Sequence, residues 1–514
     1  MGTTDVIFDE SFAFPSHLRR GRGGAEPARV AVIGAGAGGM AAAYELQRHG
    51  LDVTIYERTA RPGGRVRTQR FWDGTHGELG AMRIPGNHHC TLHYINEFDL
   101  ATRPFVNANP DAYYLLRGRR ARRHAVREVL PAYRLEPGEQ DDPLRLLEEL
   151  LREAWHGLGD HRRKALLAGD VADPELDRLA ATSLWQFTRE RLSPDAWDLI
   201  GNASGLLHYE HASLLEVLVD YFGLFNVDQL ELVDGTDALI RAFATVLRPG
   251  SLRLATRITE IRITADGVRL RGDRHGAEIT DTADYVVCAI PAPGLDQIDI
   301  TPALPAKQRQ AVRGISYASS AKTLVHVRER TWEHGDGIFG GGSFTDLPIQ
   351  QVWYPSDNAA NPANAADARQ EGGETRWVAA DPERSHSAAV LTAAYLWENN
   401  ARRFAALPES DRTRIVLGSL EQLHPGITAT VDDVVHWTWD EQVGIGGGAF
   451  AYLAPGQHTR YHAELGAPHP YSNPRVFFAG EHLSVAHAWI QGALQSGITA
   501  VEQILDQVSV SRAA

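Results

Sequence analysis

The first regular pattern along the chain is a short apolar run that ends at a glycine-rich turn. Residues 29–33 read Arg-Val-Ala-Val-Ile, which is typical of a strand buried on both faces. Residues 40–48 are rich in alanine and predict a helix that ends before Gly50. Residues 52–57 form a second apolar run. The order strand, helix, strand predicts a βαβ unit near the start of the chain.

The hydrophobic period then becomes helical and later returns to that of strands. Leucines at 144, 147, 150 and 151, and apolar residues at 214, 215, 218 and 222, recur at helical spacing and predict a helical region over residues 142–230. The glycines at 444–448 predict a break. We expect strands within 252–271, 283–291, 322–327, 433–440 and 475–479, a surface loop or lid at 358–370, and a closing helix at 488–508.

Composition narrows the class of protein. The chain has 514 residues, 43% of them hydrophobic, and a formal net charge of -14, which argues against nucleic acid or an anionic membrane as its main partner. Two cysteines, Cys90 and Cys288, exclude a disulfide framework, and the pairs His88-His89 and His482 with His487 lack the carboxylate or cysteine partners of a metal site, so we expect none. No secretory signal and no membrane-spanning run is visible, so we expect a cytoplasmic protein.

The turn after the first strand carries a dinucleotide fingerprint. Gly34-Ala-Gly36-Ala37-Gly38-Gly39 follows a strand and opens a helix, so the glycines allow a tight turn and close approach of a pyrophosphate to the helix N-terminus. Glu57, at the end of the second strand, is placed to accept hydroxyls of the adenosine ribose. The fingerprint leaves NAD and FAD open. The following loop contains Gly64 and Arg65, which suit packing on a cofactor and neutralising its phosphates.

Several motifs spread over the chain resemble the flavin-dependent amine oxidase family, and within it the L-amino-acid oxidases. They are residues 34–39 with Glu57, Arg-Pro-Gly-Gly-Arg-Val-Arg-Thr at 61–68, Glu-Leu-Gly-Ala-Met-Arg-Ile-Pro at 78–85, Lys322, residues 343–355, and Ala-Gly-Glu at 479–481 through Trp489. The resemblance implies FAD bound without a covalent bond, because neither cysteine lies where the flavinylated members carry theirs.

The resemblance also implies an architecture. The fold class expected is α/β with α+β elements: a Rossmann-like FAD-binding domain, a mixed-sheet substrate domain and an inserted helical region. The expected divisions are an N-terminal extension at 1–28, an FAD-binding domain at 29–90, 235–300 and 456–514, a substrate-binding domain at 91–141 and 301–455, and the helical region at 142–234.

The resemblance assigns roles to particular side chains. Arg83 is expected to hold the substrate α-carboxylate, a task for which a guanidinium suits through two parallel hydrogen bonds, with Tyr354 adding a phenol donor. A buried ion pair with Glu78 is the alternative for Arg83. Lys322 is expected near the flavin N5, where reduced flavin meets dioxygen. The residues expected to contact the cofactor are Gly34, Gly36, Ala37, Gly38, Gly39, Glu57, Arg58, Gly64, Arg65, Gly80, Ala81, Met82, Arg83, Ile258, Trp437, Glu481, Trp489 and Ile490.

Two positions depart from the family pattern. Many members carry glycine where Ala488 stands, and the methyl group narrows the space beside a carbonyl expected to receive the substrate ammonium. Asp220 stands where some members carry a proposed basic histidine; it would either favour a cationic substrate side chain or face solvent, and we favour solvent.

The implied reaction is oxidative deamination of an L-amino acid by dioxygen to a 2-oxo acid, ammonia and hydrogen peroxide. Alternatives with the same cofactor are an amino-acid 2-monooxygenase that decarboxylates oxidatively and an amine oxidase for amines without a carboxylate. A non-catalytic flavin-binding protein and an NAD-linked dehydrogenase are alternatives from other classes. We expect no nucleic-acid or membrane partner, and a homodimer as the default assembly.

Overall fold

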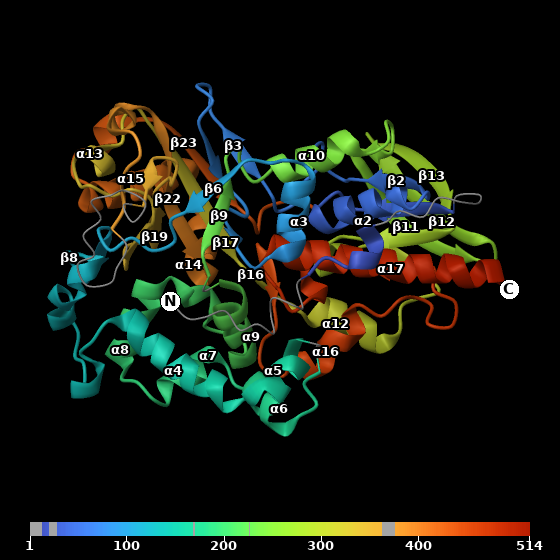
Figure 1. Ribbon diagram of the computed structural model, residues 1–514, viewed down its shortest axis with the longest axis horizontal. Helices are drawn as coiled ribbons and strands as arrows, with labels where there is room; N and C mark the ends of the chain where they lie inside the picture. Colours follow the sequence, from blue (N-terminus) through green and yellow to red (C-terminus); the bar gives the residue numbers. More distant parts are fainter. Residues whose placement is uncertain (1–12, 20–27, 168–169, 226, 362–375, 514) are drawn as a thin grey trace.

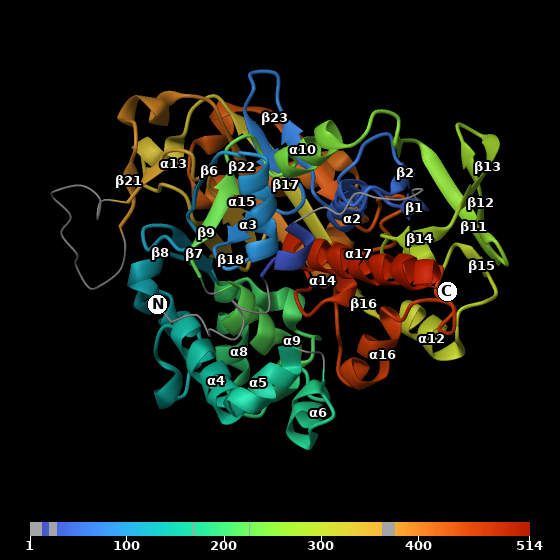
Figure 2. The ribbon, with the colours of Figure 1, turned by 45° about the vertical axis from the view of Figure 1, so that its right-hand side comes forward.

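The computed structural model describes residues 13–19, 28–167, 170–225, 227–361 and 376–513. A five-stranded parallel sheet lies on one side of the molecule, a larger mixed sheet on the other, and a group of helices beneath them (Figures 1 and 2). The α/β fold with an inserted helical region, expected from the sequence, is confirmed.

The parallel sheet is built on the predicted βαβ unit. Its order is β10 (Leu252–Arg253), β2 (Asp52–Tyr56), β1 (Arg29–Ile33), β14 (Tyr285–Cys288) and β25 (Val476–Phe478). The strands are apolar on both faces because both faces are covered. One face packs on α2 (Ala37–Arg48), α3 (His89–Glu97), α10 (Ala238–Val246) and the long α17 (Ile490–Ala513). The other packs on β11 (Thr256–Thr264), β12 (Gly267–Arg274), α12 (Ala306–Gly314) and α16 (Gln457–Leu465).

Several predicted boundaries shift. Helix α2 begins at Ala37 rather than residue 40, because the glycine-rich turn itself supplies the N-cap, Gly36. The run at 252–271 contains the short β10 and most of an antiparallel hairpin, β11 with β12; β13 (Ala277–Ala283) and β15 (Asp299–Thr301) complete that sheet. The closing helix runs to Ala513.

The larger sheet has seven strands and forms the opposite wall of the molecule. Its order is β23 (Val431–Thr438), β17 (Ser320–Val327), β22 (Ala389–Trp397), β19 (Gln351–Trp353), β18 (Gly342–Thr345), β7 (Tyr113–Leu116) and β8 (Arg119–Arg122). Among the described residues of this sheet, β7 and β18 form the one parallel pair. Helices α13 (Thr331–His334), α14 (Glu398–Ala405) and α15 (Glu409–Leu423) lie beside it in Figure 1. The loop predicted at 358–370 falls partly within 362–375, outside the described residues.

The helical region starts its helices with side-chain caps and prolines. Asp142, Asp173, Ser193 and Ser213 each accept a hydrogen bond from a backbone N–H of the first turn that follows, which satisfies donors that a helix start leaves free. The helices are α4 (Pro143–Gly157), α5 (Gly159–Leu167), α6 (Pro174–Ala180), α7 (Leu184–Arg189), α8 (Pro194–Ser204), η5 (Leu206–Tyr209), α9 (Leu214–Val219) and the π-helix η6 (Asp220–Phe225).

The end of that region is a strand rather than a helix. β9 (Gln229–Leu232) pairs with β5 (Ile84–Pro85) and β6 (Thr102–Phe105), and so ties the helical region to the segment that carries Arg83. Part of the N-terminal extension packs against the core. Phe14 and Leu18 are 5% and 2% exposed and belong to the core around α2 and α17, because each is apolar and meets that cluster. Residues 1–12 and 20–27 lie outside the described residues.

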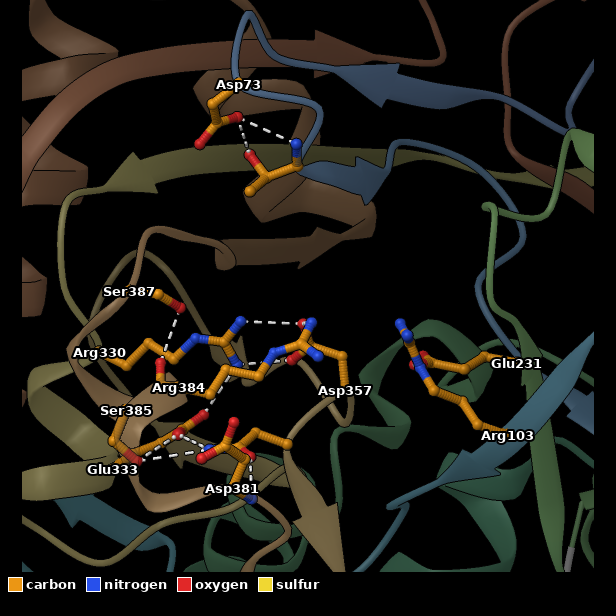
Figure 3. A network of polar contacts seen from close by, with 12 residues as sticks. Asp73, Arg103, Glu231, Arg330, Glu333, Asp357, Asp381, Arg384, Ser385 and Ser387 are labelled. Atoms are coloured by element: carbon orange, nitrogen blue, oxygen red, sulfur yellow. Dashed lines mark hydrogen bonds and ion pairs between the residues drawn. The ribbon is translucent and has the colours of Figure 1, made fainter.

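A buried arginine ties together three segments at the edge of the larger sheet. Arg330 is 2% exposed; its Nη1 lies 2.6 Å from Asp357 Oδ1 and 3.0 Å from Glu333 Oε1. Figure 3 shows Arg384 approaching the same Asp357 carboxylate. The guanidinium neighbours hold the pKa of Asp357 at about 2 despite its burial. Across the described residues, we find no helix with the length and apolarity needed to span a bilayer.

Candidate active site

A cavity of about 830 Å³ lies where the parallel sheet, the larger sheet and the helical region meet. All but two of the residues singled out from the sequence line it; the exceptions are Gly39 and Tyr354. The predicted residues that line it are Gly34, Gly36, Ala37, Gly38, Glu57, Arg58, Gly64, Arg65, Gly80, Ala81, Met82, Arg83, Ile258, Lys322, Trp437, Glu481, Ala488, Trp489 and Ile490.

The end of the cavity beside the parallel sheet is shaped by backbone. A Cβ added to Gly36 would meet nothing within 4 Å, so this position leaves the cavity open against the start of α2. Gly39 lies behind that surface, where a Cβ would stand 2.0 Å from the Gly34 carbonyl oxygen. Glu57 Oε2 accepts from Ala35 N at 2.8 Å, and Oε1 accepts from Thr59 N at 2.8 Å. The carboxylate is thereby held at the cavity wall.

In the basic loop after β2, some arginines form an ion pair with a carboxylate and others do not. Arg65 Nη1 donates to Glu481 Oε1 at 2.6 Å, so the charge expected to meet a pyrophosphate is already compensated by Glu481. Arg58 and Arg67 form no ion pair with a carboxylate among the described residues, and the Arg67 guanidinium lies 3.7 Å from the centre of a Trp437 ring. Positive charge for a phosphate therefore remains in the wall, and Arg67 is a candidate that sequence reasoning missed.

These features fit a dinucleotide cofactor with a planar ring system. The open face at Gly36, the unpaired arginines and the ends of two helices suit phosphates and polar edges. The indole N–H of Trp437 is buried and has no hydrogen-bond partner within the described part of the chain. Such a donor is costly unless a bound group satisfies it.

Arg83 projects into the part of the cavity between the larger sheet and the helices. Its Nη1 donates to Asn107 Oδ1 at 2.9 Å, and its guanidinium lies 4.8 Å from the Phe225 ring and 5.1 Å from the Trp353 ring. No carboxylate forms an ion pair with it among the described residues, so the alternative of a pair with Glu78 is wrong. Burial lowers the pKa of Arg83, but arginine stays charged at any ordinary pH.

Tyr354 does not join Arg83. It is 2% exposed, belongs to the core between the larger sheet and α15, and its hydroxyl lies 2.6 Å from both Ser343 Oγ and His424 Nε2. The physical reason is strand alternation: Gln351 and Trp353 of β19 face the cavity, and the neighbouring positions face the other side. The side chain beside Arg83 is Trp353, one residue earlier.

Lys322 is buried in the cavity wall and holds the segment that leads to Arg83. Its Nζ donates to the carbonyls of Gly80 at 2.7 Å and Glu78 at 3.1 Å, and lies 4.4 Å from the Tyr395 ring. Burial lowers the pKa of the Lys322 ammonium and raises the pKa of the Glu78 carboxyl, while each charge favours the other.

Asp220 faces the cavity, so the expectation that it faces solvent is wrong. It is 9% exposed and its Oδ1 accepts from Trp489 Nε1 at 2.7 Å. Asp220 begins the π-helix η6, which also brings Phe225 next to Arg83. A π-helix has more residues per turn than an α-helix, so its side chains point in directions that an α-helical hydrophobic pattern does not predict. Burial raises the pKa of Asp220 to about 6, against hydrogen bonds from Trp489 and Tyr209.

A group of possible metal ligands lies elsewhere. Glu329, His334 and His386 place ligand atoms within 4.8 Å of one another at the surface, and none of the three lines the cavity. Sequence spacing gave no sign of this group, because His386 lies 52 positions after His334 and meets it only in the folded chain.

Comparison with known proteins agrees with this geometry. The chain is 30% identical over 491 residues to an L-amino-acid oxidase of Siganus canaliculatus, covering 93% of this chain and 85% of that protein. It is 29% identical to an L-amino-acid oxidase of Crotalus adamanteus (93% and 87% covered) and 29% identical to the putative L-amino-acid oxidase YobN of Bacillus subtilis (93% and 95%).

Solved structures share the fold. Cyclohexylamine oxidase from Brevibacterium oxydans superimposes with a TM-score of 0.71 at 19% identity, covering 94% of this chain and 100% of that one. Putrescine oxidase bound to putrescine gives 0.69 at 20% identity, covering 94% and 99%. The model of the flavin-containing amine oxidoreductases matches residues 37–505, and the chain belongs to that family.

Proposed function

We propose that this protein is an FAD-dependent L-amino-acid oxidase. The observation that carries the proposal is Arg83, a guanidinium in the cavity wall that is hydrogen-bonded to the neutral Asn107 and forms no ion pair with a carboxylate among the described residues, although Asp220 attracts it from farther away. A buried cation of this kind is stabilised by an anionic ligand, and a planar guanidinium suits a carboxylate. The L-amino-acid oxidases at 28–30% identity over most of the chain support the same substrate class.

The side chains around Arg83 would fix how the substrate lies. Asn107, Phe225 and Trp353 restrict the guanidinium, so a carboxylate bound to it is held in one orientation and Cα is presented to the cofactor. The Ala488 carbonyl is proposed to accept from the α-amine. Bound FAD would supply the two-electron acceptor. Lys322 is proposed to place positive charge where dioxygen is reduced.

The cofactor is proposed to be held without a covalent bond. Cys90 and Cys288 are both buried and neither lines the cavity, which supports a cofactor without a bond to a cysteine. Heat or acid denaturation should release FAD into the supernatant.

Two alternatives keep the cofactor. A 2-monooxygenase would share Arg83 but release carbon dioxide and form an amide. An amine oxidase would need no carboxylate contact; the two solved amine oxidases share the fold, but at 19–20% identity they carry no argument on substrate.

The test is turnover of the purified holoenzyme with each standard L- and D-amino acid and with simple amines, following peroxide, ammonia and carbon dioxide. Peroxide and ammonia in equal amounts from L-amino acids, without carbon dioxide, are expected before any non-enzymatic reaction of peroxide with the 2-oxo acid. An amide product or a preference for amines would overturn the proposal. The homodimer and the cytoplasmic location stay predictions, which size-exclusion chromatography and cell fractionation would test.

A further inference from the structure

The loop before α17 contains a residue in a conformation that its side chain disfavours. Ala488 lines the cavity with a φ of +68°, in the left-handed region that L-residues with a Cβ seldom adopt. Such a conformation persists only where the surroundings hold it. Ala488 and its neighbour Trp489 form one wall of the cavity, so whatever holds them sets the shape of that wall.

Two buried carboxylates contact this loop at neighbouring residues. Glu481 Oε2 accepts from the Ala488 backbone N–H at 3.1 Å, while its other oxygen is paired with Arg65. Glu216, on α9 of the helical region, has its Oε1 2.5 Å from Nδ1 of His487. Glu216 and His487 are 7% and 4% exposed, so this contact is shielded from water.

Four histidines lie near Glu216 and the loop, and His487 is the one whose positive charge balances the Glu216 carboxylate. Glu216 Oε2 lies 3.7 Å from His458 Nε2, but burial lowers the pKa of His458 well below its usual value. Burial likewise lowers the pKa of His462, on α16, and of His482, on η10 (Glu481–Leu483), each to about 4. These three histidines are therefore neutral near pH 7.

His487 behaves in the opposite way. Glu216, and beyond it Glu481, raise the pKa of His487 to about 9 against the effect of burial. The cluster thus holds two carboxylates and two cations, Arg65 and His487, each cation beside one carboxylate.

We propose that Glu216 is a positioning residue: by pairing with His487 it holds Ala488 in its strained conformation and so sets the place of the Ala488 carbonyl and the Trp489 ring in the cavity. The contact joins the helical region to the cavity wall across 271 positions of the chain. The effect on catalysis rests on the proposed function, whereas the effect on the loop does not.

The test is a double-mutant cycle between Glu216→Gln and Ala488→Gly. Glutamine keeps the size of the side chain and removes its charge, and glycine removes the penalty of the left-handed conformation. Glu216→Gln alone should lower kcat/KM for the best L-amino acid by roughly tenfold, mainly through kcat, and in the Ala488→Gly background by about threefold or less, since coupled neighbours are not additive. Glu175→Gln, which breaks an exposed ion pair with Arg178 on α6, is the matched control and should leave kcat/KM unchanged in both backgrounds.

Two further readouts separate positioning from a loss of stability. In the pH profile of kcat/KM, we expect the alkaline limb of the wild-type enzyme near pH 9, the pKa of His487. Glu216→Gln should move this limb to lower pH, because His487 loses its counter-charge and then deprotonates at a lower pH. The denaturation midpoint should fall less in the glycine background than in the alanine background. If Glu216→Gln does not fold, His487→Gln takes its place: it should abolish the alkaline limb near pH 9, because the titrating group is gone, and should again lower the denaturation midpoint less in the glycine background.

Additive effects of the two substitutions on both kcat/KM and unfolding, with an unmoved alkaline limb, would overturn the inference. If the wild-type protein oxidised no L-amino acid, the proposed function would fail by itself. The double-mutant cycle measured by denaturation midpoints would then still decide whether Glu216 holds the loop.

Discussion

Replacing Arg83 by alanine tests the proposed substrate contact most directly. The guanidinium is already removed from bulk water and lies against Phe225 and Trp353, so little reorganisation is left for substrate binding to bring about. Truncating one member of a buried charged pair costs about 2–5 kcal/mol. At about 1.4 kcal/mol per tenfold change, kcat/KM for an L-amino acid should fall by roughly 30- to 4,000-fold. Arg83→Lys should recover little of this, because an ammonium cannot form the same two parallel bonds.

The decisive measurement compares each amino acid with the amine that lacks its carboxylate. In the wild-type enzyme the amine should be the poorer substrate by a similar factor, and in Arg83→Ala the two should differ little, because the group that distinguishes them is gone. Arg123→Ala is the matched control: Arg123 also lines the cavity, but its Nη1 donates to the Gly342 carbonyl at 3.2 Å. An equal loss for amine and amino acid in Arg83→Ala would refute a carboxylate contact.

Three further outcomes are expected. Lys322→Met should slow reoxidation of the reduced enzyme by dioxygen by roughly 10²-fold and slow anaerobic reduction less, as stopped-flow absorbance would show; equal slowing of both would contradict the proposed role. Arg330→Ala should lower the free energy of unfolding by about 3–5 kcal/mol in denaturant titration, because Glu333 loses its counter-charge in the interior and Asp357 keeps only the more exposed Arg384; a loss below about 1 kcal/mol would place the network at the level of a surface pair. The pKa of Asp357 is depressed to about 2, so the ionised Asp357 contributes fully to the free energy of unfolding above the pKa of about 4 that it has in the unfolded chain. This contribution is lost as the pH falls from about 4 to 2. Asp357→Asn should therefore flatten the plot of unfolding free energy against pH in that range, and an unchanged slope would count against the ion pair with Arg330.

The βαβ unit and its fingerprint could be predicted from the sequence because their determinants are local. Gly34, Gly36 and Gly39 act through their own backbone and the helix that follows, and Glu57 ends the next strand. The helical region was predictable for a similar reason: its hydrophobic period is local, and α4, α6, α7, α8 and α9 each start at their own capping residue. Arg83 stood out because an arginine in an apolar segment needs a partner, although its location in the cavity needed the fold.

The orientation and pairing of side chains depended on the tertiary structure. In β19 a shift of one residue exchanges the two faces of the sheet, so Trp353 rather than Tyr354 lies beside Arg83, and the two positions look alike in sequence. The partners Arg65 and Glu481 are 416 positions apart, and Glu216 and His487 are 271 apart. Local sequence therefore determined which backbone conformations form, whereas the packing of distant segments determined which charges meet and which face the cavity, because burial and pairing are properties of neighbours in space.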